Sequence, residues 1–360
     1  MSHNHHIALL PGDGIGREVL DAARCVLERV SEVHGLHFEF SAYAFGGAGI
    51  DSLGTPLPEA TLTACQEADA ILMGAIGGPK WDGLRGADRP ESGLLRLRSE
   101  LGVFANLRPV TVPESLAHLS VLPAEKVAGV DIMVVRELTG GIYFGTPRIQ
   151  EAHRALDTMV YDVQEIERIT RVAGEWATRR SGRIISVDKA NVLAVSRLWR
   201  ETASRIIRDE FPDVKLDHMY VDNAAMQLVL DPHQFDVILT GNLFGDILSD
   251  LSSTLAGSLG LLPSASLGGT TPLFESVHGS APDLAGLNRA NPVAAILSAA
   301  MMLDEWDYAE AAASIRSAVS ATLKKGLFTA DLVLEGSSYQ SATVFTDVVL
   351  SNLNLSEPVS

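Results

Sequence analysis

Two aspartates four residues apart could bind a divalent metal ion. Asp246 and Asp250 lie in VILTGNLFGDILSDLSSTLAG, where a helical pattern follows a buried strand. This spacing places both carboxylates on one helical face, where two like charges are unfavourable unless a cation lies between them. Oxygen ligands of this kind suit Mg²⁺ or Mn²⁺, and Asp222, at the end of MYVD, is a candidate third ligand. The alternative is that acids near a helix start only complement its dipole, which fits Asp246 better than Asp250.

Three arginines could bind a substrate that carries several carboxylates. They are Arg98 in GLLRLRSELG, Arg108 in FANLRPV and Arg136 in VVREL. The guanidinium fork matches a carboxylate in a bidentate way. The alternative is three unrelated surface arginines. Arg108 favours the first interpretation, because a solvated helix face is disfavoured between a hydrophobic run and Pro109.

A lysine and a tyrosine could exchange protons with such a substrate. Lys189 follows the strand-like run RIISVD, and α/β sheets bind their ligands at strand C-termini. Near a metal ion and arginines its ammonium pKa would fall, so that it could act as a base; an ion pair with Asp188 is an equally good interpretation. Tyr143 in TGGIYFG is either a phenolic acid or an aromatic residue of a strand.

Alternating strand-like and helical runs must position these residues. Strands are predicted at 6–10, 37–43, 69–74, 129–138, 183–190, 216–222 and 235–241, and helices at 16–33, 58–67, 162–180, 196–210, 242–256 and from about 292. This alternation predicts an α/β fold with mostly parallel, covered strands. Residues 76–92 and 257–291 are rich in Gly and Pro and poor in periodicity, so we expect long functional loops there. Both flank the middle third, which indicates one domain interrupted by another, with a cleft between.

The composition limits the class of protein and its partners. The chain has 360 residues, enough for about two domains, and is 46% hydrophobic and 20% charged, as is typical of a soluble α/β protein. Its net charge of −17 argues against nucleic acid or an anionic membrane as the main partner. No signal peptide is recognisable, and the longest apolar stretch, residues 293–303, is too short to span a bilayer. We therefore expect a cytoplasmic protein.

Cysteines and N-terminal histidines are not expected to do chemistry. Cys25 and Cys65 lie in helix-like runs without metal or redox spacing, which predicts buried structural thiols in a reducing compartment. His3, His5 and His6 could bind a metal ion, but an unstructured tail is the favoured interpretation.

A glycine-rich turn near the N-terminus is similar to a dinucleotide-binding loop only in outline. LLPGDGIGREV, residues 9–19, joins a strand to a helix, but Gly12, Gly14 and Gly16 give GxGxG rather than the GxGxxG of a Rossmann fold. No acidic residue ends a second strand at the expected distance of about 20 residues. The turn is therefore not predicted to anchor a pyrophosphate.

Taken together, these motifs are similar to those of the β-decarboxylating dehydrogenases of the isocitrate/isopropylmalate dehydrogenase family, in the branch that uses 3-isopropylmalate. The resemblance runs from residue 11 to about residue 345 and rests on ESGLLRLRSELGVFANLRP, VRELTGGIYFG, VDKANVL, YVDNAAMQL, GNLFGDILSD and HGSAPDLAG. It implies two α/β domains with a cleft between them and a non-Rossmann cofactor site. Residues 1–103 plus 257–360 would bind the cofactor, and 104–256 would carry the metal and substrate residues and a dimer interface.

The resemblance also implies an activity and roles for the candidate residues. The reaction would be the NAD-dependent oxidative decarboxylation of 3-isopropylmalate to 4-methyl-2-oxopentanoate, a step of leucine biosynthesis. Lys189 would take the hydroxyl proton and Tyr143 would help protonate the enol. In this family the equivalents of Lys189 and Asp222 reach the site from the other subunit, which implies a homodimer with two shared sites. The carboxylates of the substrate would be held by Arg98, Arg108 and Arg136, and Mg²⁺ or Mn²⁺ by Asp222, Asp246 and Asp250.

Substrate and cofactor choice follow from two further segments of the resemblance. Leu94 and Leu95, with Val192 of the partner subunit, would form an apolar pocket for the isopropyl group, while Glu91 would repel an additional carboxylate. Asp283 would accept hydrogen bonds from a free adenosine 2′-hydroxyl and repel a 2′-phosphate, which predicts NAD⁺ rather than NADP⁺. The cofactor site as a whole would comprise Ile15, Gly78, Glu91, His278, Gly279, Ser280, Ala281, Asp283 and Asn291.

Three other functions are alternatives. The first is another dehydrogenase of the same family, for isocitrate, homoisocitrate or tartrate; Leu94, Leu95 and Glu91 argue most strongly against isocitrate. A non-catalytic regulatory subunit would be favoured by loss of a metal carboxylate, the lysine or the tyrosine, and none is lost. A plain nucleotide-binding module leaves the arginines and aspartates unexplained.

Overall fold

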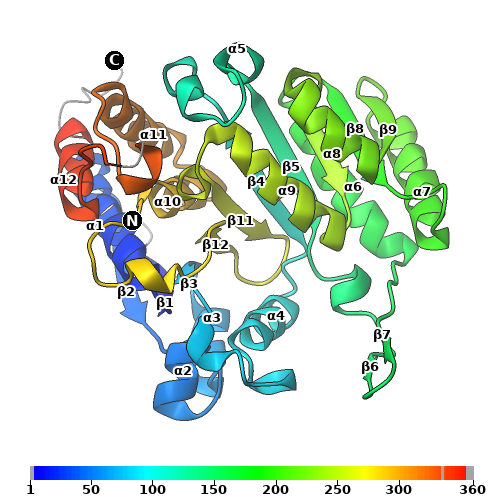
Figure 1. Ribbon diagram of the computed structural model, residues 1–360, viewed down its shortest axis with the longest axis horizontal. Coiled ribbons are helices and arrows are strands. Elements are labelled where there is room, and N and C mark those ends of the chain that lie inside the picture. The colour runs from blue at the N-terminus through cyan, green and yellow to red at the C-terminus, as the bar shows by residue number, and fades with distance from the viewer. Residues whose placement is uncertain (1–3, 334–335, 354–360) are drawn as a thin grey trace. The chain divides into compact units, whose positions relative to one another are not determined.

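The computed structural model describes residues 4–333 and 336–353, which fall into two compact units (Figure 1). Unit 1 takes in the described residues up to Gly102, Ser258–Ala265 and those from Gly269 onward. Unit 2 comprises Val103–Gly257 and Ser266–Gly268. Each unit combines sheet strands with helices, which confirms the predicted α/β fold class.

Unit 1 is built on five strands in the order β2-β1-β3-β12-β11. The neighbours of β1 on both sides, and the pair β3 and β12, are parallel. The strands are β1 (Asn4–Gly12), β2 (His37–Ala42), β3 (Ala70–Ala75), β11 (Pro263–Leu267) and β12 (Leu273–Ser276). The helices are α1 (Gly16–His34), α2 (Gly46–Leu53), α3 (Glu59–Glu67), α4 (Pro90–Leu101), α10 (Val293–Glu305), α11 (Ala309–Lys324) and α12 (Ala342–Leu353).

The long helix α1 forms because its apolar residues recur at helical spacing and its end carries a glycine. This apolar stripe is fully or almost fully buried, and Gly35 ends the helix in the left-handed conformation, with φ of 67°. Each buried Val or Leu of such a stripe contributes about 1.5–3 kcal/mol to folding. The buried stripe consists of Val19, Leu20, Ala23, Val26, Leu27 and Val30.

Unit 2 is built on five strands in the order β4-β5-β10-β8-β9, of which only the β4–β5 pair is antiparallel. The strands are β4 (Ala105–Thr111), β5 (Asp131–Glu137), β8 (Arg183–Asp188), β9 (Lys215–Tyr220) and β10 (Val237–Thr240), with a small hairpin of β6 (Ile149–Gln150) and β7 (Ala155–Leu156). The helices are α5 (Ala124–Val127), α6 (Val163–Thr178), α7 (Ala194–Glu210), α8 (Val221–Leu230) and α9 (Asn242–Ala256). Helix α6 begins at a capping box of Asp162 and Glu165.

The predicted loop at 257–291 is wrong in part, because it contains two strands. β11 (PSASL) and β12 (LFES) are almost entirely buried. β12 and the first three residues of β11 belong to unit 1, and the last two residues of β11 belong to unit 2. Strands this short, rich in serine and flanked by Gly and Pro, show no alternating pattern, so only their sheet partners reveal them. Helix α2 was missed for a similar reason, since its sequence GGAGIDSL has three glycines.

The N-terminal histidines and one cysteine also differ from expectation. His5 and His6 lie in β1 rather than in an unstructured tail, while His3 lies outside the described residues. The buried His5 ring stacks on Trp306 at 4.0 Å between centroids, which gives it a structural role. Cys65 is buried as predicted, and burial raises its thiol pKa to about 12. Cys25 is only half-buried.

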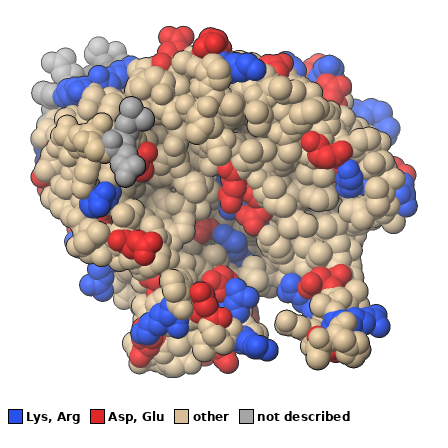
Figure 2. All heavy atoms as spheres, viewed as in Figure 1, with Lys and Arg blue, Asp and Glu red and all other residues tan. Residues whose placement is uncertain are grey.

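The charge distribution on the surface and the apolar character of the helices bear on binding to nucleic acids and membranes. On the face shown in Figure 2, basic and acidic side chains are intermingled and do not gather into a basic patch. Within the described part of the chain, no helix has both the length and the apolar character needed to cross a bilayer.

Candidate active site

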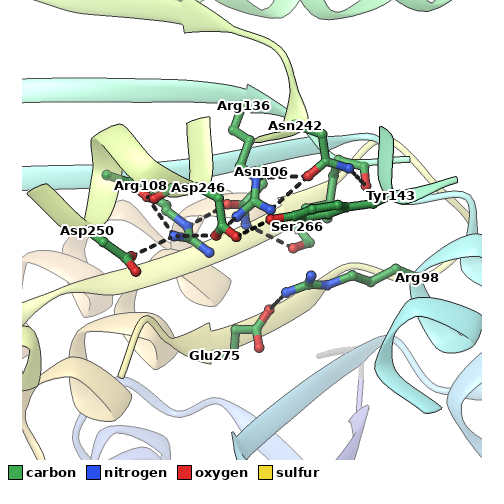
Figure 3. A network of polar contacts seen from close by, with 12 residues as sticks. Arg98, Asn106, Arg108, Arg136, Tyr143, Asn242, Asp246, Asp250, Ser266 and Glu275 are labelled. Carbon is green, nitrogen blue, oxygen red and sulfur yellow. Dashed lines mark hydrogen bonds and ion pairs between the residues drawn. The ribbon is translucent and has the colours of Figure 1, made fainter. Parts of the chain in front are cut away.

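Arg136 organises a polar cluster in unit 2 (Figure 3). It projects from β5 and is 2% exposed. Its Nη1 donates to Asp246 Oδ1 at 2.5 Å, and its Nε and Nη2 donate to Asn242 Oδ1 at 3.2 and 2.7 Å. A Cβ on Gly245 would lie 2.6 Å from Arg136 Cγ, so the glycine makes room for the arginine against α9. The buried charge is thus held by two residues of one helix.

Arg108 approaches the same helix from β4. Its Nη1 donates to Ser249 Oγ at 2.6 Å and lies 3.5 Å from Asp250 Oδ1 and 3.7 Å from Asp246 Oδ1. Its Nε donates to Asn106 Oδ1 at 2.8 Å. Both arginines are buried and paired, so the alternative of unrelated surface arginines is wrong for them.

The two aspartates share a face of α9, beyond its first turn. The first turn of this helix contains no acidic residue, so complementing the helix dipole does not explain Asp246 and Asp250. Partial burial raises the pKa of the Asp250 carboxyl; the charge of Asp246 adds to this rise, while Arg108 opposes it. A cation between the two carboxylates would relieve the repulsion between Asp246 and Asp250. Their oxygen atoms are ligands of the type that suits Mg²⁺ or Mn²⁺.

Tyr143 completes the cluster as a proton donor. It ends a short 3₁₀ turn, Gly141–Tyr143, rather than lying in a strand, so its interpretation as a strand aromatic is wrong. Its hydroxyl donates to Asp246 Oδ2 at 2.8 Å. Burial, together with the hydrogen bond to Asp246, raises the pKa of Tyr143 to about 12. The phenol therefore keeps its proton at neutral pH.

Lys189 and Asp222 form a separate pair within the chain. Lys189 directly follows β8, and its Nζ donates to Asp222 Oδ1 at 2.5 Å, which lowers the pKa of Asp222. Asp222 lies in the first turn of α8, not at the end of a strand. The alternative partner of the lysine is wrong, because Asp188 pairs with Arg200 at 2.8 and 2.9 Å. Among the described residues, no three acidic, His or Cys side chains gather as metal ligands.

The remaining substrate candidates lie on α4 of unit 1, apart from Val192. Arg98 is buried, and its Nη2 donates to Glu275 Oε1 at 2.6 Å. Glu91 is half exposed in the first turn of α4 and pairs with Arg89 at 3.2 Å. Leu94 and Leu95 are half-buried, and Val192 in unit 2 is 64% exposed.

Ile15 and the candidate cofactor residues of the 278–283 segment are neighbours in unit 1. The backbone N–H of Ile15 donates to Ser280 O at 2.8 Å, so the glycine-rich turn and the 278–283 segment are neighbours. A Cβ on Gly14 would lie 2.0 Å from the same oxygen, so only glycine fits at this position. Ala281 adopts φ of 37°, and exposed Asp283 follows it in the short turn Pro282–Leu284.

In the part of the chain that the structure describes, His278 offers an unpartnered nitrogen at this loop, whereas Asn291 is already paired within unit 1. His278 Nδ1 donates to Gly279 O at 2.9 Å, while its buried Nε2 has no hydrogen-bond partner among the described residues. Burial lowers the pKa of His278, which favours the neutral ring, and a neutral ring that donates from Nδ1 has Nε2 as its acceptor. Asn291 Nδ2 donates to Asp331 Oδ2 at 3.0 Å. An orphaned buried acceptor is a place for a donor of a bound group.

Several residues of the site were missed by sequence reasoning. Asn242 holds Arg136, and its backbone N–H donates to Tyr161 Oη at 2.7 Å. Ser249 and Asn106 hold Arg108. Asn242 and Ser249 lie in the GNLFGDILSD motif together with the aspartates, and that proximity was the available signal.

The chain is similar to characterised families over nearly its whole length. Residues 6–349 match the family model described as isocitrate/isopropylmalate dehydrogenase. A 3-isopropylmalate dehydrogenase of Salinibacter ruber is 57% identical, covering 96% of this chain and 94% of the relative. One from Wolinella succinogenes is 54% identical, covering 97% of each.

Solved structures agree with this assignment. The crystal structure of an isocitrate dehydrogenase from Methylococcus capsulatus matches with a TM-score of 0.85 and 35% identity, over 97% of this chain and 99% of that one. A β-decarboxylating dehydrogenase from Thermococcus kodakarensis matches with a TM-score of 0.79 and 35% identity, over 97% and 96%. With a family model that matches almost the whole chain and relatives above 50% identity, this chain belongs to the isocitrate/isopropylmalate dehydrogenase family.

Proposed function

We propose that this chain catalyses the metal-dependent oxidative decarboxylation of 3-isopropylmalate to 4-methyl-2-oxopentanoate, with NAD⁺ as hydride acceptor, in leucine biosynthesis. The observation that carries the proposal is the cluster in which Arg108 and Arg136 adjoin Asp246, Asp250 and the protonated Tyr143. It combines cations for a dicarboxylate, oxygen ligands for a cation and a proton donor. The relatives above 50% identity carry the name of this activity.

The residues of the cluster divide the reaction between them. Arg108 and Arg136, with Arg98 of unit 1, bind the two carboxylates of the substrate in bidentate fashion. Asp246 and Asp250, with Asp222, hold Mg²⁺ or Mn²⁺. When bound, the metal ion supplies Lewis acidity at the substrate hydroxyl and the dinucleotide supplies the hydride acceptor.

Two proton transfers belong to protein side chains. Lys189 accepts the proton of the C2 hydroxyl as the alcohol is oxidised. Tyr143, whose pKa of about 12 keeps the phenol protonated, then donates a proton to the carbon from which CO₂ has departed. Leu94, Leu95 and Val192 of the partner subunit surround the isopropyl group.

We further propose a homodimer in which Lys189 and Asp222 serve the partner's site. Apolar side chains are exposed on α8 and α9: Met226 at 51%, Leu230 at 52% and Ile247 at 55%. Met226 and Leu230 are four residues apart, so they share a helical face that a second copy would cover. In the described residues of one chain, Asp222 pairs with Lys189 and does not join the α9 aspartates in a ligand cluster.

A panel of substrates and cofactors tests the activity. Purified protein is expected to reduce NAD⁺ with 3-isopropylmalate in the presence of Mg²⁺ or Mn²⁺, and to lose that activity in EDTA. Isocitrate should be turned over far more slowly, because Glu91 repels its third carboxylate. Tartrate should also be slow, because it has a hydroxyl in place of the isopropyl group that Leu94 and Leu95 would contact. Equal turnover of isocitrate would contradict the assignment of the apolar pocket, and full activity in EDTA would contradict the metal role.

The cofactor preference is expected to shift when the charge at Asp283 is reversed. A carboxylate accepts hydrogen bonds from a 2′-hydroxyl and repels a 2′-phosphate, so the double variant Asp283→Lys with Leu284→Tyr should raise kcat/KM for NADP⁺ relative to NAD⁺ by at least tenfold, which is about 1.4 kcal/mol. The exposed position of Asp283 makes a folding defect unexpected. An unchanged ratio of the two kcat/KM values would exclude Asp283 as the ribose-binding residue.

A further inference from the structure

The carboxylate of Asp13 is buried among three segments of unit 1. It lies in the glycine-rich turn after β1 and is 5% exposed. Its Oδ2 accepts the backbone N–H groups of Gly47 at 2.8 Å and Gly77 at 2.7 Å, and its Oδ1 accepts that of Ala48 at 2.7 Å. One side chain therefore joins the start of α2 to the loop that follows β3.

Close backbone contacts keep this carboxylate in place. The N–H of Asp13 donates to Ala75 O at 2.7 Å, and its carbonyl accepts the N–H of Gly16 at 2.9 Å. A Cβ on Gly12 would lie 2.0 Å from Ala75 O, and one on Gly46 would lie 2.8 Å from Asp13 Oδ2. The spacing GxGxG thus serves to bring Asp13 and its backbone against β3 and α2.

The loop that Asp13 holds adjoins Gly78, one of the residues proposed to bind the cofactor. A Cβ on Gly77 would lie 3.0 Å from Glu91 Oε1, so the Gly77 peptide adjoins a proposed cofactor residue. The Trp81 ring packs so closely on α2 that a Cβ on Gly47 would lie 2.3 Å from it. Asp51 of the same helix accepts from Trp81 Nε1 at 3.3 Å and from Lys80 Nζ at 2.5 Å. The start of α2 and residues 77–81 therefore form one assembly with Asp13 at its centre.

We propose that Asp13 is a positioning residue for NAD⁺ binding, which acts by fixing the Gly77–Gly78 backbone beside Glu91. This inference rests on the proposed function only in taking NAD⁺ as the cofactor. The role requires a carboxylate, because an amide has one acceptor oxygen and would point N–H groups at a backbone N–H. A backbone N–H that loses its acceptor in the protein interior costs free energy, so the loop that carries Gly77 would move away from residue 13.

Asp13→Asn, with Asp69→Asn as the matched control, tests this role. Asp69 Oδ2 also accepts a backbone N–H, that of His6 at 2.8 Å, but at the opposite end of β1. Asp13→Asn is expected to raise the Kd for NAD⁺ roughly ten- to a hundredfold, and the KM for 3-isopropylmalate by less than twofold. Amide hydrogen exchange should become faster in residues 44–52 and 76–82, and Asp69→Asn should change neither the NAD⁺ affinity nor the exchange of these segments.

Each other outcome has a distinct meaning. Unchanged NAD⁺ affinity in Asp13→Asn, or equal losses in both variants, would overturn the positioning role. A wild-type protein that does not bind NAD⁺ would overturn the proposed cofactor instead, while hydrogen exchange would still report whether Asp13 holds the loop. Should Asp13→Asn not fold, Asp13→Ser, which retains one acceptor, is expected to raise the Kd for NAD⁺ while leaving the KM for 3-isopropylmalate nearly unchanged. A Kd for NAD⁺ equal to that of the wild type would contradict the proposal.

Discussion

Replacing Asp246 by asparagine is expected to lower kcat/KM for 3-isopropylmalate roughly 10³-fold, or about 4 kcal/mol. The carboxylate has two roles at once, since Oδ1 accepts from Arg136 at 2.5 Å and Oδ2 accepts from Tyr143 at 2.8 Å. An amide presents a nitrogen in place of one oxygen, so one of these donors loses its acceptor. The variant also loses an anionic ligand for Mg²⁺, and steady-state kinetics together with Mn²⁺ titration measure both effects.

A control separates this loss from a general effect of removing an acidic group. Asp209 lies in an exposed ion pair with Arg208 at 2.8 Å, and Asp209→Asn should leave kcat/KM and the free energy of unfolding nearly unchanged. Thermal unfolding of Asp246→Asn should show a folded protein, because Asn242 still accepts from the buried Arg136. If Asp246→Asn kept a tenth of the wild-type kcat/KM with normal Mn²⁺ affinity, the metal assignment would be wrong.

Two inactive variants are expected to restore activity when they are combined in one dimer. In the proposed dimer each site takes Asp246 from one chain and Lys189 from the other. A heterodimer of Lys189→Ala and Asp246→Ala chains therefore has one site with both changes and one intact site. Purified through two different affinity tags, it should show about half the wild-type activity per dimer.

The matched control combines two changes on the same side of the site. Arg136 and Asp246 contact each other within one chain, so a heterodimer of Arg136→Met and Asp246→Ala chains has one defect in each site. It should stay inactive. No recovery in the first heterodimer would place Lys189 in the same chain's site and exclude sharing. Recovery in the control would instead contradict the assignment of Arg136 and Asp246 to one site.

The elements with long periodic patterns could be predicted well. Helix 242–256 was predicted with the bounds that α9 has, and the apolar stripe of α1 is the one that is buried. β11 and β12 could not be found, because a strand of four or five residues has too few positions to show a period. The sequence left open whether Tyr143 is a phenolic acid or an aromatic residue of a strand, and the structure places it in the 3₁₀ turn Gly141–Tyr143.

For the site, residue type and local spacing were enough to predict candidate residues. A separation of four residues puts Asp246 and Asp250 on one helical face wherever α9 lies, because that geometry depends only on the helical repeat. The arginines, the lysine and the tyrosine were likewise recognisable as charged or titratable groups in apolar surroundings.

Which of these groups contact one another could be seen only in the tertiary structure. Arg136 reaches Asp246 across 110 positions of sequence, and it does so because Gly245 leaves room for its side chain. Asp13 collects N–H groups from segments 34 and 64 residues away. Such contacts depend on how closely two backbones approach, and local sequence carries no measure of that distance. The sequence therefore identified the candidate groups, while packing between distant segments determined their partners.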